Sequence, residues 1–208
     1  MRYLLFGDSI AWGHNDILNR GWAGRLKKHI HKNIINKKRK GSHFRNYAVS
    51  GYTSRDVLKI IDKKIKKIIK KYPKEEITII ISIGTNDSQK DITNQRKGIP
   101  KKEFKENISK LIKISKIYTE KIFIFGILPV NEELLKSKKS NYKYYNKRII
   151  EYNEILKQVS RLEKVKFKEF FETWIKKDTQ KLFNDGLHPN KLGHHIYFKE
   201  VKDLFSYS

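Results

Sequence analysis

The chain has 208 residues, and its 47 Lys and Arg against 22 Asp and Glu give a formal net charge of +25. This length favours one domain, which we assign to residues 1–208. The absence of Cys excludes disulfides, thiolate metal sites and Cys nucleophiles, and a hydrophobic content of 38% excludes a disordered chain. No apolar run reaches the roughly 18 residues of a membrane span. The N-terminus turns acidic at Asp8, too early for a secretory signal, so we expect a soluble, cytoplasmic protein.

The predicted elements alternate between short apolar runs and longer amphipathic segments. The predicted strands are, in chain order, residues 2–6, 43–49, 77–83, 122–127 and 165–167. The predicted helices are residues 21–33, 54–72, 101–118, 145–161 and 191–205. Two stretches, 87–100 and 129–144, are expected to be long loops. Strands that alternate with helices predict an α/β fold with a parallel five-stranded sheet and right-handed crossovers.

The positive charge raises the question of nucleic-acid binding, because Lys and Arg neutralise phosphates. Of the 47 cations, however, 38 are Lys and nine are Arg, whereas nucleic-acid readers tend to use Arg for bidentate contacts. The lysines accompany many Ile and Asn residues, a composition that A/T-rich codons produce. We therefore favour a codon bias on solvated helix faces. A nucleic-acid or anionic-surface binding module stays a remote alternative.

The residues after each predicted strand matter most, because ligands of parallel α/β sheets bind beyond the carboxyl ends of the strands. Ser9 follows the first strand, and its hydroxyl becomes a nucleophile if a base takes its proton, although Ser also caps helices. Gly51 follows the second strand and offers a bare backbone N–H. Asn86 follows the third and offers amide donors to a developing oxyanion. A simple turn is the alternative interpretation of Gly51 and Asn86.

Asp185 and His188 stand three residues apart in the segment Asp-Gly-Leu-His-Pro. At this spacing the carboxylate can accept the Nδ1 proton of the imidazole, which leaves Nε2 free as a base. Pro189 disfavours a helix through His188, and an ordinary surface His in a turn is the alternative. Together, these segments supply a nucleophile, two kinds of hydrogen-bond donor, and a base with its orienting carboxylate.

With these segments together, the sequence resembles the SGNH (GDSL-type) hydrolase family over nearly its whole length. The resemblance runs through Gly7-Asp8-Ser9-Ile10, Ser50-Gly51, Gly84-Thr85-Asn86-Asp87 and Asp185-Gly186-Leu187-His188-Pro189. It implies a flavodoxin-like, three-layer α/β/α sandwich around the five-stranded parallel sheet, and an esterase activity.

The resemblance also implies a role for each matched residue. Ser9 would be the nucleophile, His188 the general base and Asp185 the residue that orients the base. The oxyanion hole would consist of the backbone N–H groups of Ser9 and Gly51 and the side chain of Asn86.

The polar loops favour small or polar esters over long-chain lipids. We expect a serine esterase that cleaves short-chain or carbohydrate-linked acetyl esters. An acyltransferase with the same triad, and a lysophospholipase or thioesterase, stay open as alternatives. The oligomeric state is left open.

Candidate substrate-binding residues are Asp8, Trp12, Asp87 and Tyr142. The alternatives are turn-shaping roles for the two Asp residues, core packing for Trp12 and a solvated loop around Tyr142. His14 follows the nucleophile closely and is a further pocket candidate. No cofactor or metal ion is expected, because the sequence has no His-x-x-x-His and no Gly-rich nucleotide loop.

Overall fold

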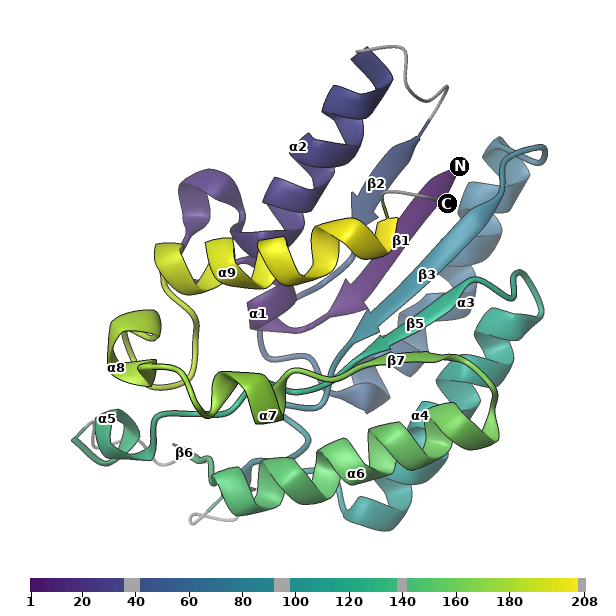
Figure 1. Ribbon diagram of the computed structural model, residues 1–208. Coiled ribbons are helices and arrows are strands. Elements are labelled where there is room, and N and C mark those ends of the chain that lie inside the picture. Colours follow the sequence, from purple (N-terminus) through teal and green to yellow (C-terminus); the bar gives the residue numbers. More distant parts are fainter. Residues whose placement is uncertain (36–41, 92–97, 138–141, 206–208) are drawn as a thin grey trace.

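The computed structural model describes residues 1–35, 42–91, 98–137 and 142–205. A five-stranded parallel sheet lies at its centre, with the strand order β2-β1-β3-β5-β7 (Figure 1). Its strands are β1 (Arg2–Gly7), β2 (His43–Asn46), β3 (Ile77–Ser82), β5 (Ile122–Phe125) and β7 (Lys166–Lys168). The predicted sheet is therefore confirmed, with small differences at strand ends. The second strand ends at Asn46, although the N–H groups of Tyr47 and Val49 still donate to the carbonyls of Leu5 and Gly7 in β1.

Helices cover both faces of the sheet (Figure 1), which confirms the three-layer α/β/α sandwich. On one face lie α2 (Gly21–Ile35) and α9 (Lys191–Val201); on the other lie α3 (Ser54–Lys71), α4 (Lys101–Lys116) and α6 (Asn146–Leu162). The packing of β1 on both faces of the sheet explains why this strand is continuously apolar. Tyr3 and Leu5 pack into the core under α2 and α9, whereas Leu4 and Phe6 pack into the core on the opposite face.

Several short elements lie outside the sequence prediction. They are α1 (Ser9–Trp12), η1 (Ile17–Asn19), α5 (Glu132–Ser137), α7 (Phe171–Trp174) and α8 (Thr179–Leu182). The last predicted helix, 191–205, is α9 followed by the 3-10 helix η2 (Lys202–Phe205). The two stretches predicted as loops also contain β4 (Lys90–Asp91) and β6 (Tyr142–Lys143), which pair antiparallel. Elements of six residues or fewer are too short to show a helical or strand period in the sequence.

The carboxyl ends of β1 and β3 meet closely at one edge of the sheet, where Gly7 pairs with Ser82. A Cβ atom on Gly7 would lie 2.6 Å from both the Ala11 Cβ and the Ser82 carbonyl oxygen. Glycine therefore lets the chain turn sharply from β1 into α1, and this turn places Ser9 above the sheet.

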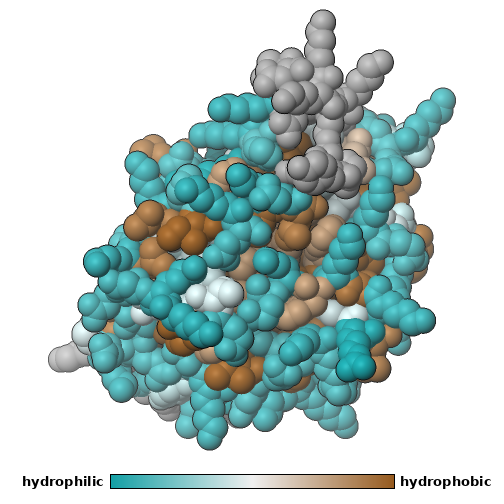
Figure 2. Space-filling view, in the orientation of Figure 1, coloured by the Kyte–Doolittle hydropathy of each residue, from teal (hydrophilic) through white to brown (hydrophobic). Residues whose placement is uncertain are grey.

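The surface is mainly hydrophilic on the face that Figure 2 shows, with small apolar patches between charged side chains. Among the residues that the structure describes, none of the helices combines the length and the apolar character needed to cross a membrane.

Candidate active site

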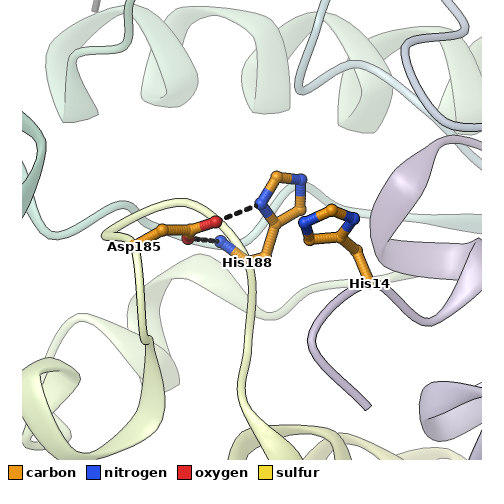
Figure 3. A group of neighbouring side chains, drawn as sticks. All are labelled: His14, Asp185 and His188. Carbon is orange, nitrogen blue, oxygen red and sulfur yellow. Dashed lines mark hydrogen bonds and ion pairs between the residues drawn. The ribbon is translucent and has the colours of Figure 1, made fainter. Parts of the chain in front are cut away.

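Ser9, His188 and Asp185 form one continuous chain of hydrogen bonds at the carboxyl edge of the sheet. The Ser9 Oγ lies 2.9 Å from the His188 Nε2. On the far side of the ring, the His188 Nδ1 lies 2.7 Å from the Asp185 Oδ2 (Figure 3). A proton on Nδ1 held by the carboxylate leaves Nε2 to accept the proton of the serine hydroxyl.

Ser9 occupies the first position of α1, and the preceding residue does the capping. The Asp8 carboxylate accepts a hydrogen bond of 3.0 Å from the Ile10 N–H. The Ser9 hydroxyl is therefore free of the capping role that its sequence context also allowed, and it bonds to His188 instead. Asp8 is buried, and this burial raises its pKa to about 6.

The loop that carries His188 is organised by Asp185. Its Oδ1 accepts hydrogen bonds from the backbone N–H groups of Leu187 (2.9 Å) and His188 (2.7 Å). Gly186 has a φ of 84° and no room for a Cβ atom beside the Asn131 carbonyl. Burial by itself would raise the pKa of Asp185, but the hydrogen bonds from the ring and backbone of His188 outweigh it. They hold the pKa of this carboxyl well below its usual value, so it stays ionised.

The two predicted donors follow β2 and β3, the strands that flank β1 in the sheet. Gly51 has a φ of 81°, and a Cβ atom there would meet nothing within 4 Å, so its peptide faces open space. The Asn86 amide donates to the Tyr52 carbonyl (2.9 Å) and its Oδ1 accepts from the Tyr144 hydroxyl (3.2 Å). These two bonds fix which way the amide points and leave its second N–H to a ligand.

The four candidate substrate-binding residues are placed differently. Trp12 is exposed over 44% of its surface and lines a cleft. Asp8 and Asp87 are only 2% and 0% exposed, so a substrate at the surface does not touch them. Asp87 accepts hydrogen bonds from the backbone and hydroxyl of Ser54 and anchors the start of α3. Burial raises its pKa to about 7. The side chain of Tyr142 lies outside the described residues.

His14, a pocket candidate from the sequence, contacts His188, which the sequence did not predict. Its ring stacks on that of His188, with centroids 4.1 Å apart and a tilt of 38° (Figure 3). Burial and then the neighbouring His188 lower the pKa of His14. The next residue, Asn15, donates to the His188 carbonyl at 3.3 Å. The only signal in the sequence was that both residues follow the nucleophile closely.

The buried side chain of His194 holds the His14 segment in place through two hydrogen bonds. Its Nε2 donates to the His14 carbonyl (2.8 Å), and its Nδ1 accepts from the Trp22 N–H (3.3 Å). His194 is fully buried, and burial lowers its pKa to about 4. The ring is therefore a neutral link between α9, α2 and the segment that follows α1.

His14, Asp185 and His188 bring three potential metal-ligating atoms within 4.8 Å of one another. Both ring nitrogens of His188 are already engaged, one by Ser9 and one by Asp185. This pattern suits proton transfer through His188 better than ligation of a metal ion, because a ligating nitrogen would have to give up its present partner.

The chain matches the family model of the GDSL-like Lipase/Acylhydrolase family over residues 3–201. It therefore belongs to this family of carboxylic ester hydrolases, as its short motifs predicted.

Similar proteins of known name agree with this assignment. The chain is 26% identical over 216 residues to the isoamyl acetate-hydrolyzing esterase of Saccharomyces cerevisiae, covering 96% of this chain and 84% of the relative. It is also similar to the solved esterase EstA of a Pseudoalteromonas species, with a TM-score of 0.68, 21% identity and coverage of 97% and 94%. A solved acetyl xylan esterase, AlAXEase, has a TM-score of 0.74 at 13% identity, with coverage of 99% and 100%. At these identities, the solved structures show the fold alone.

Proposed function

We propose that this protein is a serine esterase that cleaves short-chain or carbohydrate-linked acetyl esters, with Ser9, His188 and Asp185 as its catalytic triad. One observation carries the proposal. The Ser9 Oγ lies 2.9 Å from the His188 Nε2, and the His188 Nδ1 lies 2.7 Å from the Asp185 Oδ2. A serine hydroxyl is a weak nucleophile unless a base lies within hydrogen-bond reach, and His188 meets that condition.

In the first half of the reaction, the Ser9 Oγ attacks the ester carbonyl while its proton moves to the His188 Nε2. Asp185, kept ionised by its hydrogen bonds, stabilises the imidazolium that forms. The imidazolium then gives its proton to the leaving alcohol as the C–O bond breaks. The products of this half are the free alcohol and an acyl group on Ser9.

In the second half, water attacks the acyl group, and His188 takes the proton of the water and returns it to the Ser9 oxygen. Both halves pass through a tetrahedral oxyanion. The backbone N–H groups of Ser9 and Gly51 and the amide of Asn86 are the proposed donors to that oxyanion. The fixed orientation of the Asn86 amide supports its part in this hole, because donors that are already oriented need no rearrangement during the reaction.

Two observations support a small acetyl substrate. The yeast relative is named for isoamyl acetate, and one solved neighbour is named for acetyl xylan, so both names describe acetyl esters. The described surroundings of Ser9 are also rich in polar groups, including His14, Asn15 and Asn86, whereas long acyl chains need broad apolar surface.

The test measures hydrolysis of p-nitrophenyl esters from acetate to decanoate, together with release of acetate from acetylated saccharides. We expect the highest kcat/KM for acetate, and we expect Ser9→Ala to abolish turnover in a folded protein. Ser137→Ala, which changes an exposed serine on α5, is the matched control and should keep full activity. Turnover by Ser9→Ala at the wild-type rate would overturn the assignment. Acetyl transfer to an added sugar in preference to water would favour the acyltransferase alternative.

A further inference from the structure

A cleft of about 590 Å³ opens between α2 and β2. The strand β2 lies at one edge of the sheet (Figure 1). This volume is within the range of small-molecule binding sites. Aromatic and apolar residues line part of the cleft, with Trp12, Ile17 and Phe44 among them. Trp12 and Ile17 are exposed over 44% and 71% of their surface, so a ligand in the cleft can reach them.

The cleft lies next to the proposed nucleophile. Its lining begins at Trp12 and Gly13, and the Gly13 N–H donates to the Ser9 carbonyl at 3.0 Å. The lining is thus one helical turn away from Ser9. On the opposite wall the lining ends at Ala48, which precedes the Gly51 turn by three residues. A substrate whose ester lies on Ser9 can therefore extend into the cleft.

The charge of the cleft is of one sign. Arg20 and Lys27 line it, and its described lining includes no Asp or Glu. Among the described residues, these two cations take part in no ion pair. Arg45 lies on the lining strand but interacts with Tyr72 on the opposite face of the sheet. Arg25, on the same helix as Lys27, is neutralised by Asp16 and belongs to the structure rather than the cleft. Two cations without a carboxylate partner favour an anionic ligand.

The walls of the cleft are held in place by close backbone packing. A Cβ atom on Gly24 would lie 2.0 Å from the Asn19 carbonyl oxygen, and one on Gly13 would lie 2.4 Å from the Arg20 carbonyl carbon. The first glycine lets α2 approach η1, and the second brings the end of α1 against the start of α2. Across the cleft, the Asn46 amide donates to the Ala11 carbonyl at 2.7 Å and ties the edge strand to α1. The cleft therefore exists before a ligand arrives, which lowers the entropy cost of binding.

We propose that this cleft binds the negatively charged part of the ester substrate, a carboxylate or phosphate group held by Arg20 and Lys27 while the adjoining sugar or short chain lies against Trp12. The proposal rests on the proposed esterase function and names its substrate class: acylated acidic saccharides or other small anionic esters. Two of the residues behind the net charge of +25, Arg20 and Lys27, then have a function in substrate binding.

The test compares three substrates: acetylated glucose, acetylated glucuronic acid and acetylated glucose 6-phosphate. The variant Arg20→Gln/Lys27→Gln should raise KM for the two acidic esters by about five- to tenfold, because two exposed ionic contacts are lost. Its kcat/KM for acetylated glucose should stay within about twofold of wild type. The control Lys63→Gln/Lys67→Gln removes two exposed cations from α3, outside the cleft, and should leave all three KM values unchanged.

The comparison of carboxylate with phosphate shows which anion the cleft prefers. An equal change in KM for neutral and acidic esters, or the same change in the α3 control, would overturn the proposal. Calorimetric binding of glucuronate and glucose 6-phosphate to Ser9→Ala separates this proposal from the esterase function. Binding that Arg20→Gln/Lys27→Gln weakens supports the cleft even if no ester is hydrolysed, and an absence of binding counts against the cleft even if hydrolysis occurs.

Discussion

Replacement of His14 by alanine or phenylalanine tests what the second imidazole of the site contributes to catalysis. The wild-type ring lies 4.1 Å from that of His188, between centroids, and its lowered pKa keeps it neutral at pH 7. In the transition state His188 becomes an imidazolium. A neutral aromatic face beside a partly buried cation stabilises it by about 0.5–2 kcal/mol. Loss of that face in His14→Ala should therefore lower kcat by about 2- to 30-fold.

Phenylalanine keeps the aromatic face and cannot take a proton, so His14→Phe should recover most of the lost kcat at pH 7. It should also change the acid side of the pH profile. Two imidazolium rings at the observed 4.1 Å separation would repel by about 4 kcal/mol at an effective dielectric constant of about 20. Asp185 opposes this repulsion in part by raising the pKa of His14. Protonation of His14 should therefore steepen the loss of kcat/KM at low pH in the wild type alone.

The assay is p-nitrophenyl acetate hydrolysis between pH 4.5 and 8, with circular dichroism to show that each variant is folded. KM should change little, because His14 acts on His188 rather than on the ester. The reasoning is refuted if His14→Phe loses as much kcat as His14→Ala, or if wild type and His14→Phe share one slope at acidic pH.

Further predictions concern the neighbouring polar groups. Asn86→Ala should lower kcat by about 10²- to 10³-fold with little change in KM, and steady-state kinetics would exclude Asn86 from the oxyanion hole if kcat held. Tyr144→Phe removes a hydrogen bond to the Asn86 Oδ1 and should lower kcat by about 2- to 10-fold; an equal loss in an Asn86→Ala background would contradict this route. Asp185→Asn should cost on the order of 10⁴-fold in kcat, and near-normal turnover would remove Asp185 from the triad. Because burial raises the pKa of Asp87 to about 7, the folded state binds its proton more tightly than the unfolded state. The free energy of unfolding should therefore fall as pH rises from 4 to 7, by up to about 1.4 kcal/mol per unit, and denaturant titrations of Asp87→Asn should show a shallower fall.

The sequence predicts the sheet, Ser9 and Asn86 for the same physical reason. β-branched and aromatic runs such as Ile77–Ile83 identify buried strands, and the polar residues directly after them must gather at one edge of a parallel sheet. Asp185 and His188 lie beyond β7, α7 and α8, so they were proposed from their own three-residue spacing rather than from a strand end.

The contacts that were missed depend on side-chain packing between distant segments. No local pattern shows that His14 stacks on His188, since this contact needs the folded positions of α1 and the loop before α9. The burial of Asp8 and Asp87 is equally absent from any local pattern. Each stands beside a predicted site residue, yet each side chain turns inward and bonds the chain near a helix start. The cleft beside Ser9 was invisible for the same reason, because its walls come from separate elements.

Ser9 and His188, the proposed nucleophile and base, are separated by 179 positions along the chain. A growing polypeptide on the ribosome can thus complete most of the sheet and still lack the proposed base for Ser9, so the proposed catalysis begins only after the loop before α9 has been synthesised and docked. In refolding, helix content is set by local contacts and returns early, whereas the Ser9–His188 contact is among the most non-local in the fold. Ester hydrolysis is therefore a built-in reporter of the final docking step.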